Sequence, residues 1–386
     1  MSTATLHWGA FTEARFLREI WQRKPLLLRQ AFAGFKPLLT RAQLFALAAH
    51  EDVESRLLQR AGRRWQLDHG PFSRKQLPPV EQRNWTLLVQ GVNLHVDAAG
   101  DLLRQFRFIP DARLDDLMIS WASEGGGVGP HQDAYDVFLL QAAGRRRWRI
   151  GPVEDATLQA GKPVKLLAKF TPEEDLILEP GDMLYLPPGW GHDGIAASGD
   201  CMTYSVGFRA PPQGELLKEV LWQLAEAQQG GAIYRDPPLR SGASPARLPE
   251  AMVKFAREAF NRLKPDAAMF ENVLGLYLTT PKPQVWFESV ETPAATLRRA
   301  CRQTGCRLDR RSKMLYTEQA LFLNGEKVDA ALASSALLRQ LADQQNLSAA
   351  QVQTATSAEL TALADWCAIG WLQPGHERST PTGSRA

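Results

Sequence analysis

The sequence predicts an α+β protein with an antiparallel β-barrel of the jelly-roll or cupin type, then a helical region, then a small winged-helix-like domain. Three observations predict these three regions and their order along the chain. Short apolar segments separated by Gly/Pro turns occupy residues 1–212, helical periodicity follows over 213–280, and short strands alternate with helices over 281–386. A chain of 386 residues suits two or three domains, and an apolar fraction of 44% can fill their cores.

A β-hairpin is predicted in the middle of the barrel region. Residues 137–141 are apolar and suit a barrel wall, residues 142–144 supply a turn, and residues 145–150 return as a second strand. Side chains on a strand point alternately to its two faces. The returning strand therefore cannot send all of its four arginines to one side.

A second pair of strands repeats this arrangement. Residues 175–178 and 183–186 read as strands, and the turn between them has Pro and Gly in typical positions. Residues 187–189, Pro-Pro-Gly, end the pairing because proline cannot donate to a ladder. We expect His192 on the loop that follows.

The pattern of His131, Gln132 and Asp133 is typical of a metal site. Residues i and i+2 of a strand share a face, so His131 and Asp133 converge while Gln132 faces away. With His192 they complete the two-histidine, one-carboxylate set of non-haem Fe(II) oxygenases. A His-x-Asp pattern by itself is also compatible with a surface turn and a solvated Asp.

Arg146 is the arginine of the hairpin that we expect to point inward, because it shares a strand face with Trp148 and Ile150. The other arginines lie on the opposite face: Arg145, Arg147 and Arg149. A buried guanidinium without an anion would be costly, and its planar fork suits a carboxylate. The partner is either an internal Asp or Glu, or the distal carboxylate of 2-oxoglutarate.

Five segments carry a resemblance to the JmjC/cupin-type ribosomal oxygenases. They are residues 16–29, 126–133 (Gly-Gly-Val-Gly-Pro-His-Gln-Asp), 135–138 (Tyr-Asp-Val-Phe), 144–149 (Gly-Arg-Arg-Arg-Trp-Arg) and 180–189 (Pro-Gly-Asp-Met-Leu-Tyr-Leu-Pro-Pro-Gly). The chain departs from the family at Trp190-Gly191, where Phe-Pro is expected before the second histidine. That difference affects the cavity rim rather than the ligand.

The resemblance implies a JmjC-type double-stranded β-helix and a hydroxylase that depends on Fe(II) and 2-oxoglutarate. It implies His131, Asp133 and His192 as metal ligands and Arg146 as the 2-oxoglutarate anchor, with polar cosubstrate contacts from two further residues, Ser120 and Thr203. The bacterial branch of the family hydroxylates an arginine side chain on a large-subunit ribosomal protein. That protein is therefore the expected substrate.

The residues that would bind the substrate side chain are predicted less directly. A guanidinium requires a carboxylate and an aromatic face, which Asp116 and Tyr135 could supply beside Met118. Asp116 could equally cap a turn, and Tyr135 could be rim packing. A histidine or lysine hydroxylase would differ from an arginine hydroxylase only at this rim. A non-redox cupin, either a binding protein or an isomerase, would need no buried Arg146, and a purely structural dimeric module would need no convergent ligands.

Composition excludes several other classes. No apolar run approaches the length of a membrane span, and the polar start Met1-Ser2-Thr3 is no signal peptide. The four cysteines form no C-x-x-C pair, so we expect reduced thiols in a cytoplasmic protein. We expect Cys301 and Cys306 on one helix. Because they are five residues apart on that helix, we do not expect them to form a zinc site.

The second half of the chain shows helical and mixed patterns. Helices are predicted over residues 215–229, 249–263 and 267–278. The resemblance implies that residues 213–280 form a homodimer interface, although the same pattern would suit three helices packed within a monomer. The winged-helix-like segment 281–386 follows.

An arginine cluster lies in this last segment, while the chain as a whole has a net charge of only +3. Its members are Arg298, Arg299, Arg302, Arg307, Arg310 and Arg311. Acidic residues are interspersed, so we expect a solvated surface, support of the dimer or docking of a basic substrate rather than direct binding to nucleic acid.

Overall fold

The computed structural model describes residues 5–227, 232–238, 246–263 and 265–375. The chain divides into two compact units. The first consists of Met1–Ala210 and a short return segment, Lys282–Trp286. The second consists of Pro211–Pro281 and Phe287–Ala386, so the predicted helical region and the predicted winged helix fall in one unit.

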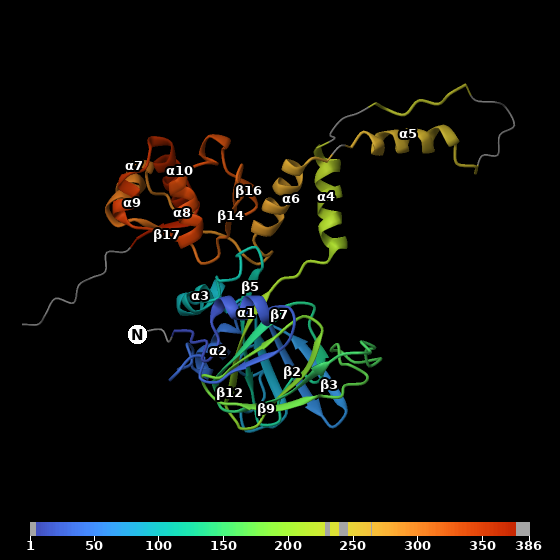
Figure 1. The fold of residues 1–386 in the computed structure, drawn as a ribbon, viewed down its shortest axis with the longest axis vertical. Helices are drawn as coiled ribbons and strands as arrows, with labels where there is room; N and C mark the ends of the chain where they lie inside the picture. The colour runs from blue at the N-terminus through green and yellow to red at the C-terminus, as the bar shows by residue number, and fades with distance from the viewer. Residues whose placement is uncertain (1–4, 228–231, 239–245, 264, 376–386) are drawn as a thin grey trace, which may run out of the picture. The chain divides into compact units, whose positions relative to one another are not determined.

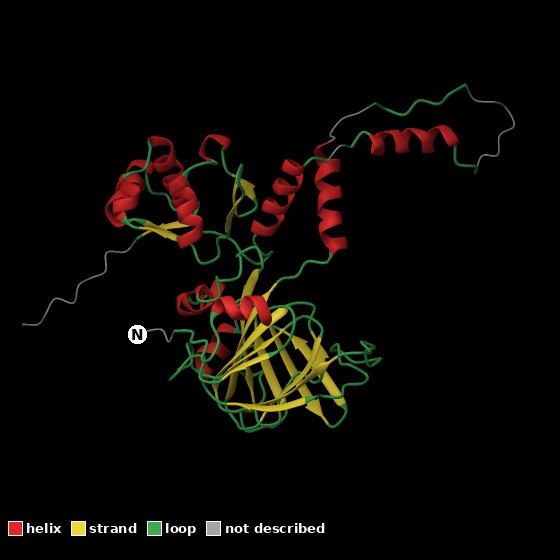
Figure 2. Ribbon diagram, viewed as in Figure 1, coloured by secondary structure: helices red, strands yellow, loops and turns green. Residues whose placement is uncertain are grey.

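The first unit is built from antiparallel strands: β1 (Leu26–Leu28), β2 (Ser55–Ala61), β3 (Arg64–His69), β4 (Trp85–Val89), β5 (Leu114–Ala122), β6 (His131–Gln132), β7 (Asp136–Ala143), β8 (Arg146–Pro152), β9 (Glu174–Leu178), β10 (Met183–Leu186), β11 (Trp190–Ala196) and β12 (Cys201–Phe208). One sheet has the order β1-β10-β7-β12-β5-β4-β2-β3, and a smaller sheet has the order β6-β11-β8-β9. The strands wrap as a barrel (Figure 2). The predicted jelly-roll or cupin fold is therefore confirmed.

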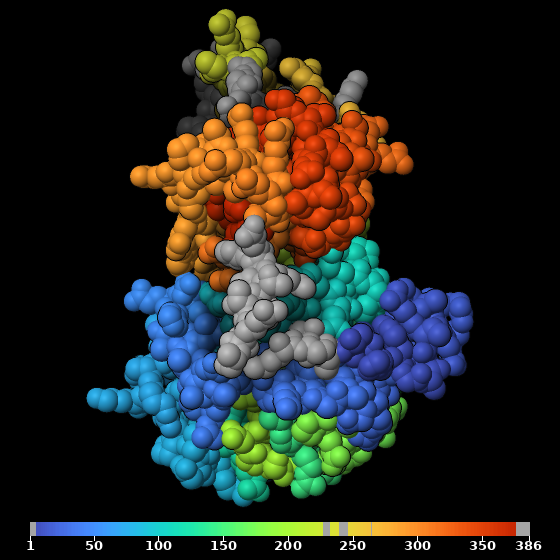
Figure 3. Space-filling view, turned by 90° about the vertical axis from the view of Figure 1, so that its left-hand side faces the viewer, coloured from blue at the N-terminus to red at the C-terminus, as the bar shows by residue number. Residues whose placement is uncertain are grey.

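The large sheet has two different faces because side chains alternate along its strands. On β5, Leu117, Ile119 and Trp121 join the main hydrophobic core with α1 (Glu13–Glu19), α2 (Arg41–Leu47) and α3 (Asp97–Arg104). A 3-10 turn, η1 (Val92–Leu94), precedes α3. These helices lie outside the strands (Figure 1), and N-terminal residues, in blue, spread over the face of this unit that Figure 3 presents. The other face of β5 is thereby directed into the barrel.

Two buried carboxylates attach the N-terminal segment to the barrel. Asp136 accepts hydrogen bonds from the Tyr185 hydroxyl (2.6 Å) and from Gln22 (3.0 Å). Asp182 pairs with Arg29 (2.7 Å) and accepts from the backbone amide of Gln30 (3.0 Å). These contacts explain why Asp occupies both positions in motifs that otherwise consist of strand and turn residues.

The second unit consists mostly of helices: α4 (Gln213–Ala227), α5 (Glu250–Asn261), α6 (Ala267–Thr279), α7 (Ala294–Thr304), η2 (Ala330–Leu332), α8 (Ala336–Gln344), α9 (Ala349–Gln353) and α10 (Ser357–Ala368). Its strands are β13 (Cys306–Leu308), β14 (Met314–Tyr316), β15 (Leu321–Leu323), β16 (Glu326–Lys327), β17 (Asn346–Leu347) and β18 (Leu372–Pro374). They form two three-stranded sheets, β17-β13-β18 and β14-β15-β16. Gly275 lets α6 approach the ring of Phe322 on β15 so closely that a Cβ there would lie 2.3 Å from it.

The predicted helices of this unit are confirmed to within two residues at the ends that can be compared, although residues 228 and 229 lie outside the described part of the chain. The prediction that Cys301 and Cys306 share a helix is wrong. Gly305, with φ of 76°, ends α7, and Cys306 begins β13. Within the described ranges, no helix is both long and apolar enough to cross a bilayer.

Candidate metal centre

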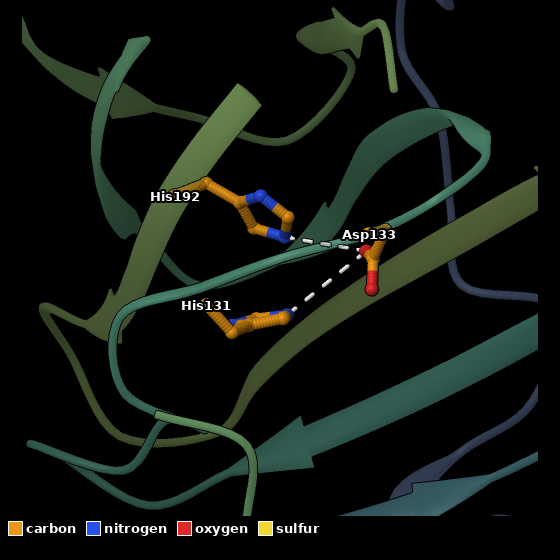
Figure 4. Close-up of side chains that lie close together, drawn as sticks. All are labelled: His131, Asp133 and His192. Carbon is orange, nitrogen blue, oxygen red and sulfur yellow. Dashed lines mark ion pairs between the residues drawn. The ribbon is translucent and has the colours of Figure 1, made fainter. Parts of the chain in front are cut away.

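His131, Asp133 and His192 come together in the barrel of the first unit (Figure 4). Each offers one ligand atom, and the three atoms lie within 4.8 Å of one another. The Asp133 carboxylate lies 4.0 Å from His131 Nε2 and 3.5 Å from His192 Nε2. These distances suit three ligands around a single ion, leaving the opposite side of an octahedral metal for other ligands.

Pairing between β6 and β11 sets this geometry, because His131 lies directly opposite His192 in the antiparallel register. The second histidine is therefore on a strand, and the prediction of a loop position for it is wrong. Glycines permit the close approach of the segment that precedes β6. A Cβ on Gly127 would lie 2.3 Å from the carbonyl oxygen of Gly194 on β11.

Backbone carbonyls orient both imidazole rings. His131 Nδ1 lies 2.8 Å from the Gly129 carbonyl oxygen, and His192 Nδ1 lies 3.1 Å from that of Trp190. A carbonyl can only accept, so Nδ1–H donates in each ring. Each Nε2 then keeps its lone pair directed towards Asp133, which is the arrangement that metal-binding histidines use.

His192 is held in the neutral form that binds metals. Burial lowers its pKa to about 4, and the neighbouring His131 and Arg146 act in the same direction. The ring is also 5.8 Å from that of Trp148, centroid to centroid. A buried, neutral imidazole beside a carboxylate fits a divalent cation, because the ligand need not lose a proton at neutral pH.

Arg146 lies on the same inward face of β8 as Trp148 and Ile150, as the alternation predicted, and only 2% of it is exposed. Its guanidinium donates to the Ser120 hydroxyl (3.1 Å), the Thr203 hydroxyl (3.2 Å) and the Gly194 carbonyl (3.2 Å). The structure thus brings together the three residues that were expected to contact the cosubstrate.

Among the described residues, Arg146 forms no ion pair with Asp or Glu, and its Nε has no hydrogen-bond partner. The outward arginines differ, because Arg147 pairs with Asp175 and Arg149 pairs with Asp193. Burial lowers the pKa of the Arg146 guanidinium, which still remains charged at any physiological pH. A buried cation with only neutral partners and a free donor fits an external carboxylate, and the part of the chain that the structure describes holds no internal salt bridge to Arg146.

Asp116 and Met118 lie on the face of β5 that carries Ser120, the face directed away from the hydrophobic core. The carboxylate of Asp116 accepts from the Gly91 amide (3.1 Å) and lies 2.9 Å from Lys282 Nζ in the return segment. Asp116 is therefore more than a turn cap, because it is a buried carboxylate that already holds a cation.

Tyr135 follows the metal ligand Asp133 by two residues and is 41% exposed. Burial raises the pKa of its hydroxyl, and the negative charges of Asp133 and Asp116 raise it further. Both carboxylates are thus close enough to act on the phenol. The ring approaches Gly207 of β12, where a Cβ would meet it at 3.8 Å. The aromatic side chain therefore lies within electrostatic range of both the metal ligand Asp133 and Asp116.

Two residues of the site were missed from the sequence. Gln141 accepts a hydrogen bond from the Thr203 hydroxyl (2.9 Å) and so orients a partner of Arg146. A polar glutamine inside an otherwise apolar strand could have indicated a buried hydrogen-bonding role. Lys282 carried no such signal, because a lysine between two prolines in a linker indicates exposure rather than a partner in a barrel.

Comparison with known proteins agrees with this geometry. The JmjC domain family matches residues 101–216, and the ROXA-like winged helix family matches residues 262–373. The chain is 39% identical to the ribosomal protein uL16 3-hydroxylase of Escherichia coli over 75% of its own length and 76% of that protein's. The chain belongs to the JmjC ribosomal oxygenases.

Other relatives cover nearly the whole chain. A probable ribosomal oxygenase of Haemophilus influenzae is 28% identical over 92% of this chain and 94% of its own. The crystal structure of Escherichia coli YcfD matches with a TM-score of 0.80 at 33% identity, covering 97% of this chain and 100% of the other. A YcfD complex with cobalt and 2-oxoglutarate matches with a TM-score of 0.78 at 32% identity, covering 96% and 99%.

Family membership makes the chain a 2-oxoglutarate-dependent oxygenase with an Fe(II) site, as the motifs predicted. The donor set formed by His131, Asp133 and His192 fits that metal. Family membership also excludes the two alternatives that are not oxygenases, the non-redox cupin and the structural dimeric module. The winged-helix prediction for the C-terminal part is confirmed, with the matched family extending back to include α6.

Proposed function

We propose that this oxygenase hydroxylates an arginine side chain of ribosomal protein uL16, using Fe(II) and 2-oxoglutarate. The observation that supports this choice of side chain best is the Asp116 carboxylate, which is buried on the same face of β5 as Ser120 and already holds a cationic group. A buried carboxylate selects a cation, since leaving it unpaired would be costly. The Escherichia coli relative named for uL16 supports the choice of protein.

The surroundings of Asp116 favour a guanidinium over an imidazole. A guanidinium presents a planar fork of donors that can bond a carboxylate through two hydrogen bonds, and its flat face can stack on the Tyr135 ring. A neutral histidine would offer one donor and leave the carboxylate uncompensated. A lysine would pair with Asp116 but would gain less from the aromatic face.

The chain's own residues have separable roles in this reaction. His131, Asp133 and His192 would hold the metal, and Arg146, with Ser120 and Thr203, would bind the far carboxylate of 2-oxoglutarate. Bound Fe(II) with 2-oxoglutarate supplies the oxidising chemistry that inserts oxygen into a C–H bond. Asp116, Met118 and Tyr135 would position the substrate side chain so that the C–H bond to be oxidised faces the metal.

Mass spectrometry tests the proposal directly. The full-length protein is incubated with iron, 2-oxoglutarate and uL16 or a uL16 peptide, and the product is fragmented to locate any gain of one oxygen atom. Oxygen on an arginine supports the proposal. Oxygen on a histidine or lysine would favour the alternative specificity on the same scaffold, and an unmodified substrate with active 2-oxoglutarate turnover would reject uL16.

We further propose that the protein works as a homodimer in the cytoplasm, where a ribosomal protein is made. Helix α4 buries Val220 and Leu224 within its own unit but leaves Leu217, Leu221 and Trp222 exposed. No residue of α5 is buried, although Met252, Val253 and Phe260 are large and apolar. An exposed apolar surface of this kind is typical of a protein–protein interface.

A further inference from the structure

Lys282 lies in the segment Lys282–Trp286, where the chain returns to the first unit after α6. Its Nζ is 2.9 Å from an Asp116 oxygen and 3.2 Å from an Asp115 oxygen. Asp116 also accepts from the backbone amide of Gly91 at 3.1 Å. The ammonium and the Gly91 amide therefore both bond Oδ2 of a carboxylate that lies on the face of β5 directed away from the hydrophobic core.

This contact conflicts with the expected role of Asp116, because a carboxylate that binds the substrate cation must be accessible to it. Lys282 already pairs with the charge of Asp116, and 35% of the lysine side chain is exposed. Asp115 is one-third exposed as well. The ion pair is consequently reached by solvent on one side, as an exchangeable pair requires.

We propose that Lys282 is an internal stand-in for the substrate, holding Asp116 until a guanidinium displaces it. The proposal rests on the function proposed above and deepens it. Lysine suits such a role because its ammonium is a single point charge on a flexible stem. An incoming arginine can form two hydrogen bonds to the same carboxylate and stack on Tyr135, so it can replace the lysine.

The stand-in would keep the empty site functional. Burial raises the pKa of Asp116, and the charge of Asp115 adds to this, whereas Lys282 opposes both. Burial by itself would lower the pKa of Lys282, but the two carboxylates raise it above its ordinary value. Each charge thus favours the charged form of the other, and the ion pair at 2.9 Å holds the Asp116 carboxylate in place until another cation replaces the lysine.

Displacement also lowers the affinity of the free enzyme for its substrate. A substrate must replace the Lys282 contact, so its apparent affinity is reduced by the fraction of molecules in which the subsite is filled. An arginine can repay this loss through its own ion pair, whereas a neutral side chain of similar shape cannot. Removing the lysine would therefore favour a guanidinium, which can pair with the freed carboxylate, more than an uncharged side chain, which cannot.

The competing explanation is a permanent ion pair that fastens the return segment to β5. The two explanations predict opposite effects of removing the charge. If Lys282 competes with substrate, Lys282→Met strengthens binding of a guanidinium. If Lys282 only supports the fold around Asp116, the same change weakens binding or leaves it unchanged.

The first experiment measures binding of N-acetylarginine amide to the full-length protein loaded with Mn(II) and 2-oxoglutarate. Wild type is compared with Lys282→Met, Lys282→Arg and, as a matched control, the exposed Lys36→Met. We expect a Kd about three- to tenfold lower in Lys282→Met, a higher Kd in Lys282→Arg, and no change in Lys36→Met. N-acetylcitrulline amide, which is uncharged, should gain less from Lys282→Met than the arginine probe.

The second experiment needs no substitution, so it holds even if a variant folds poorly. Brief acetylation of the wild-type protein, read by mass spectrometry, reports how freely Lys282 reacts. We expect saturating arginine probe to increase acetylation of Lys282 and to leave that of Lys36 unchanged. Unchanged or reduced reactivity of Lys282, or an unchanged or raised Kd in Lys282→Met, would overturn the proposal.

These readouts are independent of uL16. If no arginine of uL16 is hydroxylated but the arginine probe still binds Lys282→Met more tightly than wild type, the function proposed above fails. The proposal that Lys282 competes with a guanidinium for Asp116 then stands. If uL16 is hydroxylated on arginine but Lys282→Met has an unchanged or higher Kd, the function stands and the lysine is structural. Absence of probe binding to every variant would count against the Asp116 subsite itself.

Discussion

Replacing Arg146 by alanine is the most informative single change in this protein. Arg146 is buried, forms no ion pair with a described carboxylate and donates only to neutral partners, so a carboxylate of 2-oxoglutarate would be its main charged partner. We expect Arg146→Ala to raise the KM for 2-oxoglutarate strongly. The change should leave metal affinity nearly unaltered, because Arg146 is not among the three ligands.

The magnitude follows from the contacts. A hydrogen bond to a charged group contributes about 1.5–3 kcal/mol, and each 1.4 kcal/mol corresponds to about a factor of ten. Loss of the guanidinium should therefore raise the KM about ten- to a hundredfold. Arg146→Lys should lose less, since it keeps the charge but not the planar fork that reaches Ser120 and Gly194 at once.

Two neighbouring arginines provide matched controls. Arg145 is exposed, and Arg147 forms a surface ion pair with Asp175 whose contribution should be at most about 1 kcal/mol. Neither Arg145→Ala nor Arg147→Ala should change the KM for 2-oxoglutarate by more than about twofold. The assay follows succinate formation at varied 2-oxoglutarate, with Mn(II) binding and thermal unfolding as checks on the site and the fold. A larger effect at Arg145 or Arg147 than at Arg146 would refute the assignment.

Three further predictions concern the metal, the fold and the dimer. His192→Ala should reduce Mn(II) affinity at least tenfold by calorimetry, whereas Gln132→Ala, which faces away from the ligands, should not; equal losses would contradict the site. Asp182→Asn should cost about 1–2 kcal/mol of unfolding free energy near pH 7, and less as the pH falls below about 4. The pKa of Asp182 is lowered because the backbone amides of Gln30 and Glu179 and the charge of Arg29 outweigh the effect of burial. The stability that the carboxylate contributes is therefore lost when it is protonated. A stability difference between Asp182→Asn and wild type that stays constant across this pH range would contradict the prediction. Leu217→Glu with Trp222→Glu should shift the protein to a monomer by light scattering at unchanged helix content, and an unaltered mass would reject α4 as the interface.

Strand periodicity determined much of the site from the sequence alone. The spacing of His131 and Asp133 placed two ligands on one face, and the alternation along residues 145–150 selected Arg146 from four arginines. Both inferences depend only on the direction of successive side chains, which the backbone of a strand determines locally. Helix boundaries in the second unit were predictable for the same reason, because apolar spacing and capping residues are local signals.

Tertiary structure decided what depends on contacts between distant segments. The pairing of β6 with β11 brought His192 opposite His131 and put it on a strand, although the prolines and glycine before it indicated a loop. Gln141 acquired its role only when β12 placed Thr203 beside it. Lys282 lies 166 residues from Asp116 along the chain, and no short-range pattern connects them. The sequence specifies such contacts only through the packing of the whole unit, which is why they become visible only in the folded structure.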